Sequence, residues 1–267
     1  MRPFPDVVRI EPAGVCNLRC RHCPVGREGG RGVILSYENF VRFFDSLPKV
    51  PRVLVLYHGG EPLLNKDLEL MLAYAKARGV KKTVFNTNAA LLTEKRELIN
   101  LDEMRVSFDG ASPEENDAIR VNSHFEKHAA QVRKLAMSDA RPKVIKIYNA
   151  QHNSSQPAQY LKEYFKDCDV IFEGVQIREW ARIGNEPKPT NGVTFCSDLF
   201  SAFTILSNGD VPMCCEDLMH DDIQGNVFQN SPAELWEKME GVRQAFERRD
   251  YPKMCQTCWV VTRKRIT

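Results

Sequence analysis

The first two thirds of the chain alternate short apolar runs with longer amphipathic stretches. Six of the runs are rich in β-branched residues and have the length of strands; they lie at residues 7–11, 53–57, 83–86, 104–108, 143–148 and 170–179. Strands that alternate with helices predict a parallel sheet with right-handed crossovers. Because six strands are too few for a closed eight-stranded barrel, the pattern predicts an α/β fold with an open, partial (β/α)6 barrel.

Helical spacing and capping residues predict helices between these strands. Ser36 can cap a helix whose apolar residues recur on one face, at Phe40, Phe43, Phe44 and Leu47. Similar signals, including the capping sequence SPEE, indicate further helices at 68–77, at 94–101 and from 112 onward.

The pattern changes after residue 180. Residues 181–195 carry two prolines, two glycines and no clear period, which is typical of a linker. Beyond them, FTIL (203–206) and VPMC (211–214) flank an Asn-Gly turn and predict a short hairpin. A second capping sequence, SPAE, predicts a helix with apolar residues on one face, at Leu235, Met239, Val242 and Phe246.

We therefore expect three parts in the chain: a barrel (1–180), a linker (181–195) and a C-terminal piece (196–267). The C-terminal piece is too small and too polar to form a good core of its own. It therefore needs a cross-link such as a bound metal for its stability, and its own side chains have to provide the ligands.

Composition excludes several classes of protein. The 37 basic and 35 acidic residues nearly balance, so no global charge favours nucleic acid or an anionic membrane as the main partner. The N-terminal segment lacks an apolar core of signal-peptide length, and no later apolar run can span a bilayer. The sequence therefore predicts a cytoplasmic protein. In that compartment nine cysteines favour metal or redox chemistry over disulfides.

Eight of the nine cysteines fall into two groups, and the first group is Cys16, Cys20 and Cys23. These three follow the first predicted strand, at the edge where α/β proteins place ligands. A structural zinc site usually takes four ligands, whereas an iron–sulfur cubane takes one thiolate for each iron. Three cysteines leave one iron of a cubane open. A zinc site with a distant fourth ligand and three unrelated cysteines are the alternatives.

The spacing C-x3-C-x2-C after a first strand resembles the signature of the radical S-adenosylmethionine (radical SAM) superfamily. The resemblance implies a 4Fe–4S cluster whose fourth iron is chelated by the amino and carboxylate groups of SAM. Reduction of the cluster cleaves SAM to methionine and a 5′-deoxyadenosyl radical, which abstracts a hydrogen atom from the substrate. The chain departs from the commonest form of the signature at His22, where an aromatic residue often stands.

Three further elements at strand ends resemble the SAM-contacting elements of this superfamily. The GGEP run implies that Gly59, Gly60 and Glu61 contact the methionine amino group of SAM. The run FNTNA implies a SAM contact at Asn88, although Ala89 replaces the usual glycine, and VSFDG offers Ser107 and Asp109 to the ribose or methionine moiety. For each polar position alone, a turn or a cap is the alternative. Their shared place at strand ends favours SAM.

The second group contains Cys196, Cys214, Cys255 and Cys258, together with Cys215. Its G-x4-C and C-x2-C pattern looks like the C-terminal extension called SPASM or, when shortened, Twitch. The chain has too few cysteines for the two clusters of a full SPASM domain. The resemblance therefore implies a Twitch domain in which the first four cysteines hold one auxiliary 4Fe–4S cluster. A four-thiolate zinc site is the alternative, and either metal supplies the staple.

Cys215 is left over from this set. It can be a spare buried thiol, a ligand in place of Cys214, or a hydrogen-atom donor near the substrate. Cys168, which stands apart from both groups, is interpreted as a core residue.

The resemblance implies an enzyme, and several features favour a small-molecule substrate. The length of the chain and the run 209–229 are similar to those of the type of dehydrogenase that oxidises an aminocyclitol alcohol in the biosynthesis of the antibiotic butirosin. By that resemblance, a sugar, aminocyclitol or similar alcohol is oxidised to a ketone, and the auxiliary cluster accepts an electron. A flavodoxin- or ferredoxin-type reductant is the expected protein partner.

Three alternatives stay open at this point. One is a redox-neutral epimerase in which Cys215 returns a hydrogen atom to the substrate. Another is a SPASM-type peptide maturase, which the absence of a peptide-recognition domain before the first strand disfavours. The third is not an enzyme at all, but an iron–sulfur electron carrier or a zinc-stapled binding module.

Overall fold

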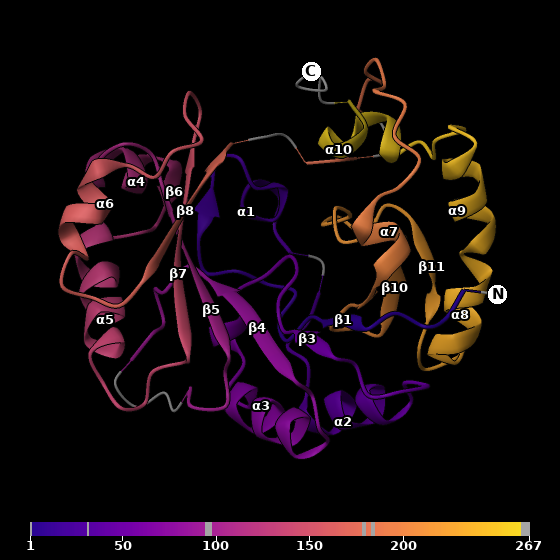
Figure 1. Ribbon diagram of the computed structural model, residues 1–267, viewed down its shortest axis with the longest axis horizontal. Coiled ribbons are helices and arrows are strands. Elements are labelled where there is room, and N and C mark those ends of the chain that lie inside the picture. The colour runs from indigo at the N-terminus through magenta and orange to yellow at the C-terminus, as the bar shows by residue number, and fades with distance from the viewer. Residues whose placement is uncertain (1, 31, 94–97, 178–179, 183–184, 263–267) are drawn as a thin grey trace.

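The computed structural model describes residues 2–30, 32–93, 98–177, 180–182 and 185–262 (Figure 1). Its centre is a curved sheet of seven strands in the order β8-β7-β5-β4-β3-β1-β9. Every neighbouring pair in this sheet is parallel. The strands are β1 (Val7–Ile10), β3 (Val53–Val55), β4 (Lys82–Thr87), β5 (Glu103–Asp109), β7 (Val144–Gln151), β8 (Ile171–Gln176) and β9 (Ala202–Ile205).

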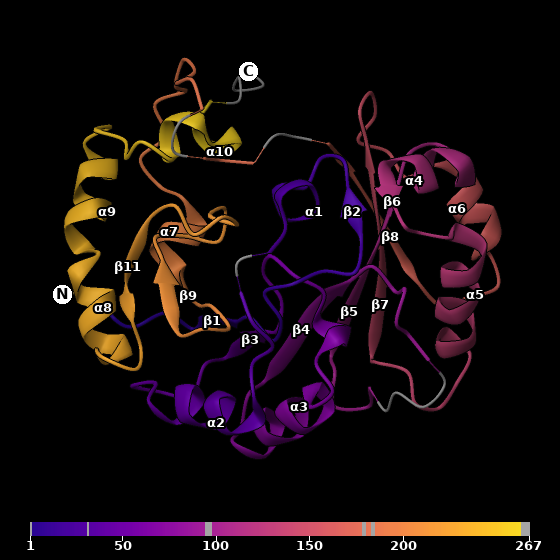
Figure 2. The same cartoon turned by 180° about the vertical axis from the view of Figure 1, so that it is seen from behind.

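Helices cover the outer face of this sheet, as Figures 1 and 2 show from opposite sides. The covering helices are α2 (Tyr37–Asp45), α3 (Leu68–Ala77), α4 (Pro113–Ile119), α5 (Phe125–Ala136) and α6 (Gln159–Tyr164). The short helix α1 (Pro24–Glu28) lies on the inner side of the curve. This arrangement confirms the predicted α/β fold with a partial parallel barrel and a C-terminal extension.

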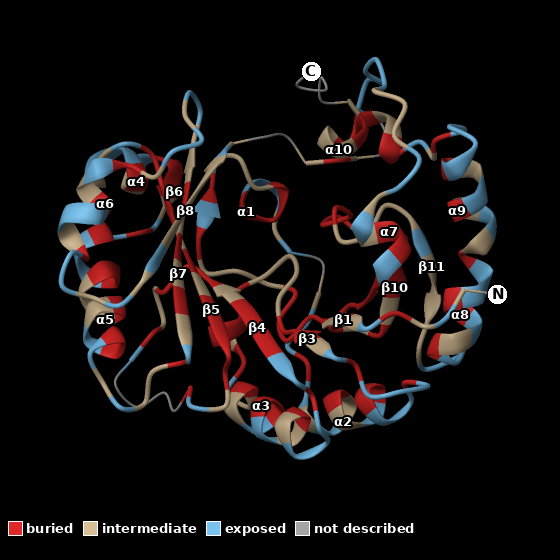
Figure 3. Cartoon of the chain, in the orientation of Figure 1, coloured by how far each residue is buried: buried red, intermediate tan, exposed pale blue. Residues whose placement is uncertain are grey.

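The main core lies between the sheet and these helices. On β1, Val8 and Ile10 are fully buried and belong to the same apolar cluster as Phe40 and Phe43 of α2. The residues that alternate with them on the strand face the inside of the barrel, because successive side chains of a strand point to opposite faces. Figure 3 shows the resulting pattern, with buried residues along the strands and on the strand-facing sides of the helices.

All six strands expected between residues 7 and 179 are present within the described residues, with small shifts of their ends. All three expected caps also form: Ser36 accepts a hydrogen bond from the Asn39 backbone N–H, Ser112 accepts one from the Glu115 backbone N–H, and Ser231 and Glu234 make a reciprocal capping box. Helices α5 and α6 were not expected from the sequence. The helix expected over 94–101 is not seen in its described part, because residues 99–100 form a turn and 94–97 lie outside the described residues.

The expected hairpin between residues 203–206 and 211–214 is wrong. The first of its strands, β9, joins the main sheet beside β1, while β10 (Asp210–Pro212) pairs with β11 (Ile223–Asn226) in a separate two-stranded sheet. All four residues of β9 are buried. Although β9 is the edge strand of the sheet, its Phe203 and Ile205 side chains belong to the main core, which an isolated hairpin could not provide.

The helix expected after residue 231 is present, but it is divided into two shorter helices. Helix α8 (Pro232–Lys238) ends at Met239, and α9 (Glu240–Glu247) begins directly after it. Near the C-terminus follow the 3-10 turn η2 (Cys255–Thr257) and helix α10 (Trp259–Thr262).

The C-terminal region has a second, smaller core. It contains Leu199, Met213, Phe246 and Met254 together with two of the cysteines, two further cysteines pack against it, and it is separate from the main cluster. The linker residues 185–195 run beside η2 and α10, with backbone hydrogen bonds from Lys188 and Asn191 to that part of the chain. The division at 180 and 196 stays a prediction, because β9 lies in the barrel sheet. Among the described residues, no helix combines the length and apolar character needed to cross a membrane.

Candidate functional site

The three N-terminal cysteines lie on one loop at the C-terminal end of β1, which we call the three-cysteine loop (residues 11–23). Cys20 is in β2 (Arg19–Cys20), which pairs with β6 (Arg120–Val121), and Cys23 is the N-cap of α1. The Cys16 thiol lies within electrostatic range of both other thiols. The structure thus brings together the three thiols that the sequence predicted to share one cluster.

Backbone and amide N–H groups point at these sulfurs. Leu18 N lies 3.4 Å from Cys16 Sγ, and Asn88 Nδ2 lies 3.7 Å from the same atom. Burial raises the pKa of Cys16 to about 11 and also raises the pKa of Cys23. At Cys23, hydrogen bonds from the Val25 and Gly26 N–H groups oppose this rise. Buried thiols that already receive N–H donors are suited to act as thiolates once a cationic metal is bound. This donor set fits an iron–sulfur cluster.

The GGEP turn packs directly against the three-cysteine loop. A Cβ on Gly60 would lie 2.1 Å from the Ala13 carbonyl oxygen and 2.4 Å from that of Val15, so only glycine fits. The next residue, Glu61, donates its backbone N–H to the Val15 carbonyl over 2.9 Å. Gly59 donates its own N–H to Glu11 Oε1 over 3.0 Å. The two motifs therefore form one structural unit.

The Glu61 carboxylate is buried and receives hydrogen bonds from the protein itself. Its oxygens accept from Leu63 N at 3.0 Å, Thr87 Oγ1 at 2.6 Å and Asn88 N at 2.8 Å. Burial raises the pKa of Glu61, and these donors oppose the shift. The carboxylate thereby ties the turn after β3 to the end of β4. The SAM contact expected of this motif stays a prediction.

Asn88 and Asp109 both lie beside the three-cysteine loop. The Asn88 amide donates to Asn17 Oδ1 over 3.0 Å and reaches the Cys16 sulfur. Asp109 ends β5, and its carboxylate lies 3.9 Å from His22 Nε2. Ser107 lies two residues earlier on the same strand and accepts a hydrogen bond from Asn86 Nδ2 at 2.9 Å. The predicted polar positions thus gather at one end of the sheet, with Ser107 deeper in the barrel.

Arg120 is a site residue that the sequence analysis missed. It is buried, it pairs with Asp109 through a hydrogen bond of 2.9 Å, and it lies within electrostatic range of Cys16 and Cys20. Burial lowers the pKa of its guanidinium, but Asp109 and the Cys20 thiol outweigh burial and raise it. Its Nε is buried without a partner among the described residues. An arginine just behind an acidic helix usually lies on the surface, so the sequence gives no signal for it.

Glu11 connects the loop to the C-terminal region. Its fully buried carboxylate accepts hydrogen bonds from Gly59 N, from Ser207 N at 3.1 Å and from Ser207 Oγ at 2.9 Å, and it lies 3.4 Å from His58 Nδ1. Burial alone raises the pKa of Glu11, but His58 and the backbone donors lower it to about 2. The carboxylate therefore stays charged and holds three segments together. Neither Glu11 nor Ser207 was singled out from the sequence.

Deeper in the barrel, below Ser107, lies a polar group of side chains. Arg105 Nη1 donates to Tyr57 Oη over 3.1 Å, and the Arg105 guanidinium lies 5.6 Å from the centroid of the Tyr148 ring. Arg105 also pairs with Glu103 over 2.6 Å. The inside of the barrel is therefore polar and hydrogen-bonded, unlike its outer face.

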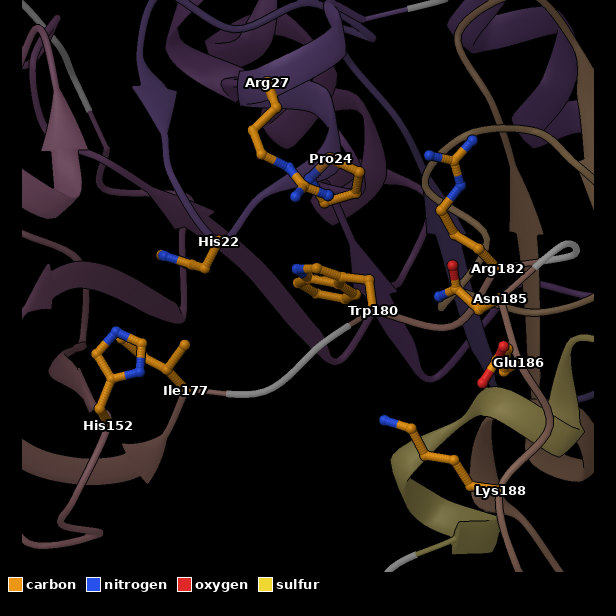
Figure 4. Close-up of a pocket in the computed structure, with 10 residues that line it drawn as sticks. All are labelled: His22, Pro24, Arg27, His152, Ile177, Trp180, Arg182, Asn185, Glu186 and Lys188. Atoms are coloured by element: carbon orange, nitrogen blue, oxygen red, sulfur yellow. The ribbon is translucent and has the colours of Figure 1, made fainter.

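Two cavities adjoin the three-cysteine loop. An inner one of about 220 Å³ lies at the ends of β7 and β8, where it is lined by Tyr148 and Val175. An outer one of about 610 Å³, which we call the mouth cavity, lies between α1 and the residues that follow β8. In Figure 4, His22 and Arg27 lie on one side of it and Lys188 on the other. The two cavities share the side chains His22, Ile177 and Trp180.

The second cysteine set surrounds a cavity of its own. Cys196, Cys214, Cys255 and Cys258 all line it, together with apolar side chains that include Met213, Phe246 and Met254. Burial raises the pKa of Cys196, Cys214 and Cys255. Four thiols that face one apolar enclosure fit a buried auxiliary cluster.

A site for a single metal ion needs a different arrangement of ligands from a cluster site. Over residues 2–262, as far as the structure describes them, no three His, Cys, Asp or Glu side chains lie close enough to hold one metal ion. A 4Fe–4S cluster makes a different demand, since each of its thiolates binds its own iron atom.

Cys215 lies outside that cavity lining and faces other groups. It is half-buried near Arg9 of β1, and it hydrogen-bonds Asp198, which itself pairs with Arg9 over 2.7 Å. Burial raises the pKa of Cys215 well above its usual value. Cys168 packs against the main core, in the position expected for it.

Two family models match the chain. Residues 10–148, more than half of the chain, match the model described as the radical SAM superfamily. Residues 196–259 match the SPASM model, described as an iron–sulfur cluster-binding domain. The two matched segments contain the two sets of cysteines.

Curated proteins of several kinds match part of the chain, and they include heme synthases and GTP 3′,8-cyclases. Over 186 residues the chain is 28% identical to an AdoMet-dependent heme synthase of Methanosarcina barkeri (strain Fusaro / DSM 804), with 65% of this chain and 49% of that protein covered. The chain spans half the length or less of the first such relatives.

Solved structures show the same fold at low identity. BtrN in complex with AdoMet and 2-DOIA has a TM-score of 0.63 at 16% identity, with 97% of this chain and 94% of that chain covered. Native anSMEcpe with bound AdoMet and Kp18Cys peptide has a TM-score of 0.64 at 17% identity, with 96% and 89% covered. One of these structures holds a small molecule and the other a peptide, so the shared fold leaves the substrate class open.

Proposed function

The chain belongs to the radical SAM superfamily, and we propose that it is an oxidoreductase that converts an alcohol of a small-molecule substrate into a ketone. Its cofactors are SAM, a 4Fe–4S cluster and auxiliary iron–sulfur clusters in the SPASM-type extension. We assign Cys16, Cys20 and Cys23 to the SAM-binding cluster. The auxiliary cluster is assigned to the four cysteines of the second cavity, Cys196, Cys214, Cys255 and Cys258.

The observation that carries this proposal is the second cavity, in which four thiols face one apolar enclosure. When bound, SAM would supply the 5′-deoxyadenosyl radical after one-electron reduction by the first cluster, for abstraction of the hydrogen atom of the carbinol carbon, and the second cluster would accept the electron that remains. The hydroxyl proton leaves to a base, so the substrate loses two hydrogen atoms in all. A fully liganded second cluster suits the acceptor role because no iron is left open for a substrate.

The residues of the chain prepare both sites. Glu61 and Glu11 fix the loops around the first set of thiols, and Asn88 supplies an amide donor to the Cys16 sulfur. The Arg120 guanidinium is a buried cation beside the same loop. It is suited to hold the SAM carboxylate. The other SAM contacts that we propose are Gly59, Gly60, Glu61, Asn88, Ser107 and Asp109. Apolar side chains keep water away from the second set of thiols.

The experiment is anaerobic reconstitution followed by separate assays of SAM cleavage and of product mass. We expect about eight iron atoms per chain, 5′-deoxyadenosine with SAM and dithionite, and a product that is lighter than the substrate by two hydrogen atoms. Cys16→Ala removes SAM cleavage, whereas Cys255→Ala leaves it and stops ketone formation. An electron carrier or zinc module gives no 5′-deoxyadenosine in the same assay. A product of unchanged mass contradicts the oxidation.

One observation favours a second candidate, redox-neutral epimerisation. Cys215 is half-buried next to Arg9, a residue of the inner barrel face, and its surroundings raise the pKa of its thiol above the usual value. A hydrogen-atom donor needs an intact S–H bond, so this position supports such a role. Epimerisation in deuterated water leaves deuterium at the inverted carbon. If Cys215→Ala leaves turnover and deuterium content unchanged, Cys215 is not the donor.

A further inference from the structure

The mouth cavity is large for a single sugar ring. Its volume of about 610 Å³ lies within the range of about 300 to 1,000 Å³ that is typical of sites for drug-sized ligands. It also continues into the inner cavity through the shared side chains His22, Ile177 and Trp180. A ligand there can extend from the three-cysteine loop out to the residues that follow β8.

Charges in the lining are unevenly compensated. Arg182 is already engaged, because its guanidinium lies 2.6 Å from Glu28 Oε1 and 3.5 Å from Asp221 Oδ2. Lys188 and Glu186 carry opposite charges on the same side of the cavity (Figure 4). Arg27, in contrast, has an exposed side chain that makes no hydrogen bond or ion pair with any described residue. It is the cation of the lining whose charge stays available.

Two further features of the lining point the same way. Arg27 lies in α1, one helical turn after Cys23, so a group bound to it stays close to the three-cysteine loop. In Figure 4 the Trp180 ring lies between Arg27 and Lys188, so a ring of a ligand that extends inward from Arg27 passes beside it. A guanidinium prefers carboxylate and phosphate, which it can bind through two parallel hydrogen bonds.

We propose that the substrate carries an anionic group, a carboxylate or a phosphate, which Arg27 binds in the mouth cavity while a ring of the substrate lies against Trp180. This inference rests on the proposed function, since it takes the ligand of the cavity to be the alcohol that is oxidised. It narrows the expected substrates. A neutral sugar gains little from Arg27, and an aminocyclitol without an added acidic group is repelled by it.

The test is calorimetric binding to the reconstituted holoenzyme with SAM, at low salt, with glucose, glucosamine, glucuronate, glucose 6-phosphate and UDP-glucose as probes. We expect the three anionic probes to bind at least about tenfold more tightly than glucose or glucosamine, and to lose this advantage in high salt. The order among the three distinguishes carboxylate, phosphate and extended diphosphate ligands. Arg27→Gln removes the advantage and Arg27→Lys keeps part of it. Arg248→Gln, which removes an exposed arginine of the C-terminal region outside the cavity lining, changes nothing.

Equal binding of glucose and the anionic probes, binding of none of the five, or an anionic preference that survives Arg27→Gln overturns the inference. The iron content of Arg27→Gln shows whether the variant is folded and loaded. The oxidation itself is scored separately from binding. Anionic probes that bind through Arg27 but are never oxidised contradict the proposed function alone. A neutral alcohol that is oxidised independently of Arg27 contradicts this inference alone.

Discussion

Gly60 is the residue at which the GGEP turn and the three-cysteine loop come closest. A methyl group at this position would lie 2.1 Å from the Ala13 carbonyl oxygen, and backbone cannot move aside cheaply. We therefore expect Gly60→Ala to push the loop away and disorder the three-thiol site. Iron analysis should fall to about half of the wild-type content, and 5′-deoxyadenosine formation should be lost. The auxiliary cluster should persist.

A matched control is Gly241→Ala in α9. Its added methyl group meets nothing within 4 Å and its φ is not positive, so the site is open for alanine. Alanine in a helix is more stable than glycine by about 0.5 to 1 kcal/mol. The control should keep full iron content and should unfold at a slightly higher urea concentration. Equal behaviour of the two variants would show that the close contact at Gly60 has no role.

Glu11 gives the molecule a stability that depends on pH. Its pKa is about 2 in the folded protein, against 4.5 for an ordinary glutamate. Because the folded-state pKa is depressed, the contribution is fully present above pH 4.5 and is lost as the pH falls from there towards 2. We expect Glu11→Gln to lower the free energy of unfolding by about 3 kcal/mol at pH 7.

The measurement is urea unfolding of wild type and Glu11→Gln between pH 7 and pH 3. The difference between the two proteins should be constant down to about pH 4.5 and should shrink below it. Acid lability of the clusters affects both proteins alike, so the difference isolates the carboxylate. A difference that does not change with pH would contradict a charged Glu11.

At the level of single residues, the sequence could identify those site residues that belong to a motif with fixed spacing. The cysteines and the GGEP run stand out because their pattern is local. Glu11 and Arg120 do not. Glu11 becomes a site residue through Ser207, 196 positions away, and Arg120 becomes one only because the chain folds back onto Asp109, 11 positions earlier. The sequence does not distinguish a buried charged residue from an exposed one, because the fold determines the burial of each residue.

Strand β9 shows the same limit at the level of elements. Its four residues and the Asn-Gly turn after them are a strong local signal for a hairpin. That signal describes the turn but not the partner strand. The pairing of β9 with β1 joins residues almost two hundred positions apart. The six earlier strands were predictable because each pairs within a repeated strand–helix unit.

Arg243 holds the helices of the C-terminal region together. It is fully buried in α9, donates to the carbonyl oxygens of Leu199 at 3.0 Å and Trp236 at 2.9 Å, and lies 3.4 Å above the Trp236 ring. Arg243→Met keeps the bulk but leaves both carbonyl groups without a donor. We expect a loss of about 2 to 4 kcal/mol in the free energy of unfolding.

Urea unfolding followed by tryptophan fluorescence measures this loss, because the Trp236 ring reports on the stacked guanidinium. Leu199 lies three residues after Cys196, so the content of the auxiliary cluster should fall as well. Arg248→Met, at the exposed C-terminal end of the same helix, is the control and should change neither quantity. Unchanged stability in Arg243→Met would mean that water replaces the lost donors.

On the scale of the whole molecule, the C-terminal region packs against the part of the chain that carries the first set of thiols. Leu218 and Met219 form a small apolar cluster with Val25, and Cys16 and Cys23 pack against it. Strand β9 pairs with β1, and Ser207 just beyond it hydrogen-bonds Glu11 in the three-cysteine loop. The C-terminal region is therefore part of the structure that positions the first site. Its four-thiol cavity has a second role in our proposal, as the site of the auxiliary cluster.

These two roles can be separated by comparing a truncated chain with a full-length variant. The fragment 1–195 lacks β9 and Ser207, so we expect it to lose the edge of the sheet beside β1 and with it SAM cleavage. The full-length double variant Cys255→Ser and Cys258→Ser keeps β9, Ser207 and the first three thiols. It should hold about half of the iron and still produce 5′-deoxyadenosine. SAM cleavage by the fragment would show that β9 is dispensable for the first site, and its loss in the double variant would show that the auxiliary cluster supports that site directly.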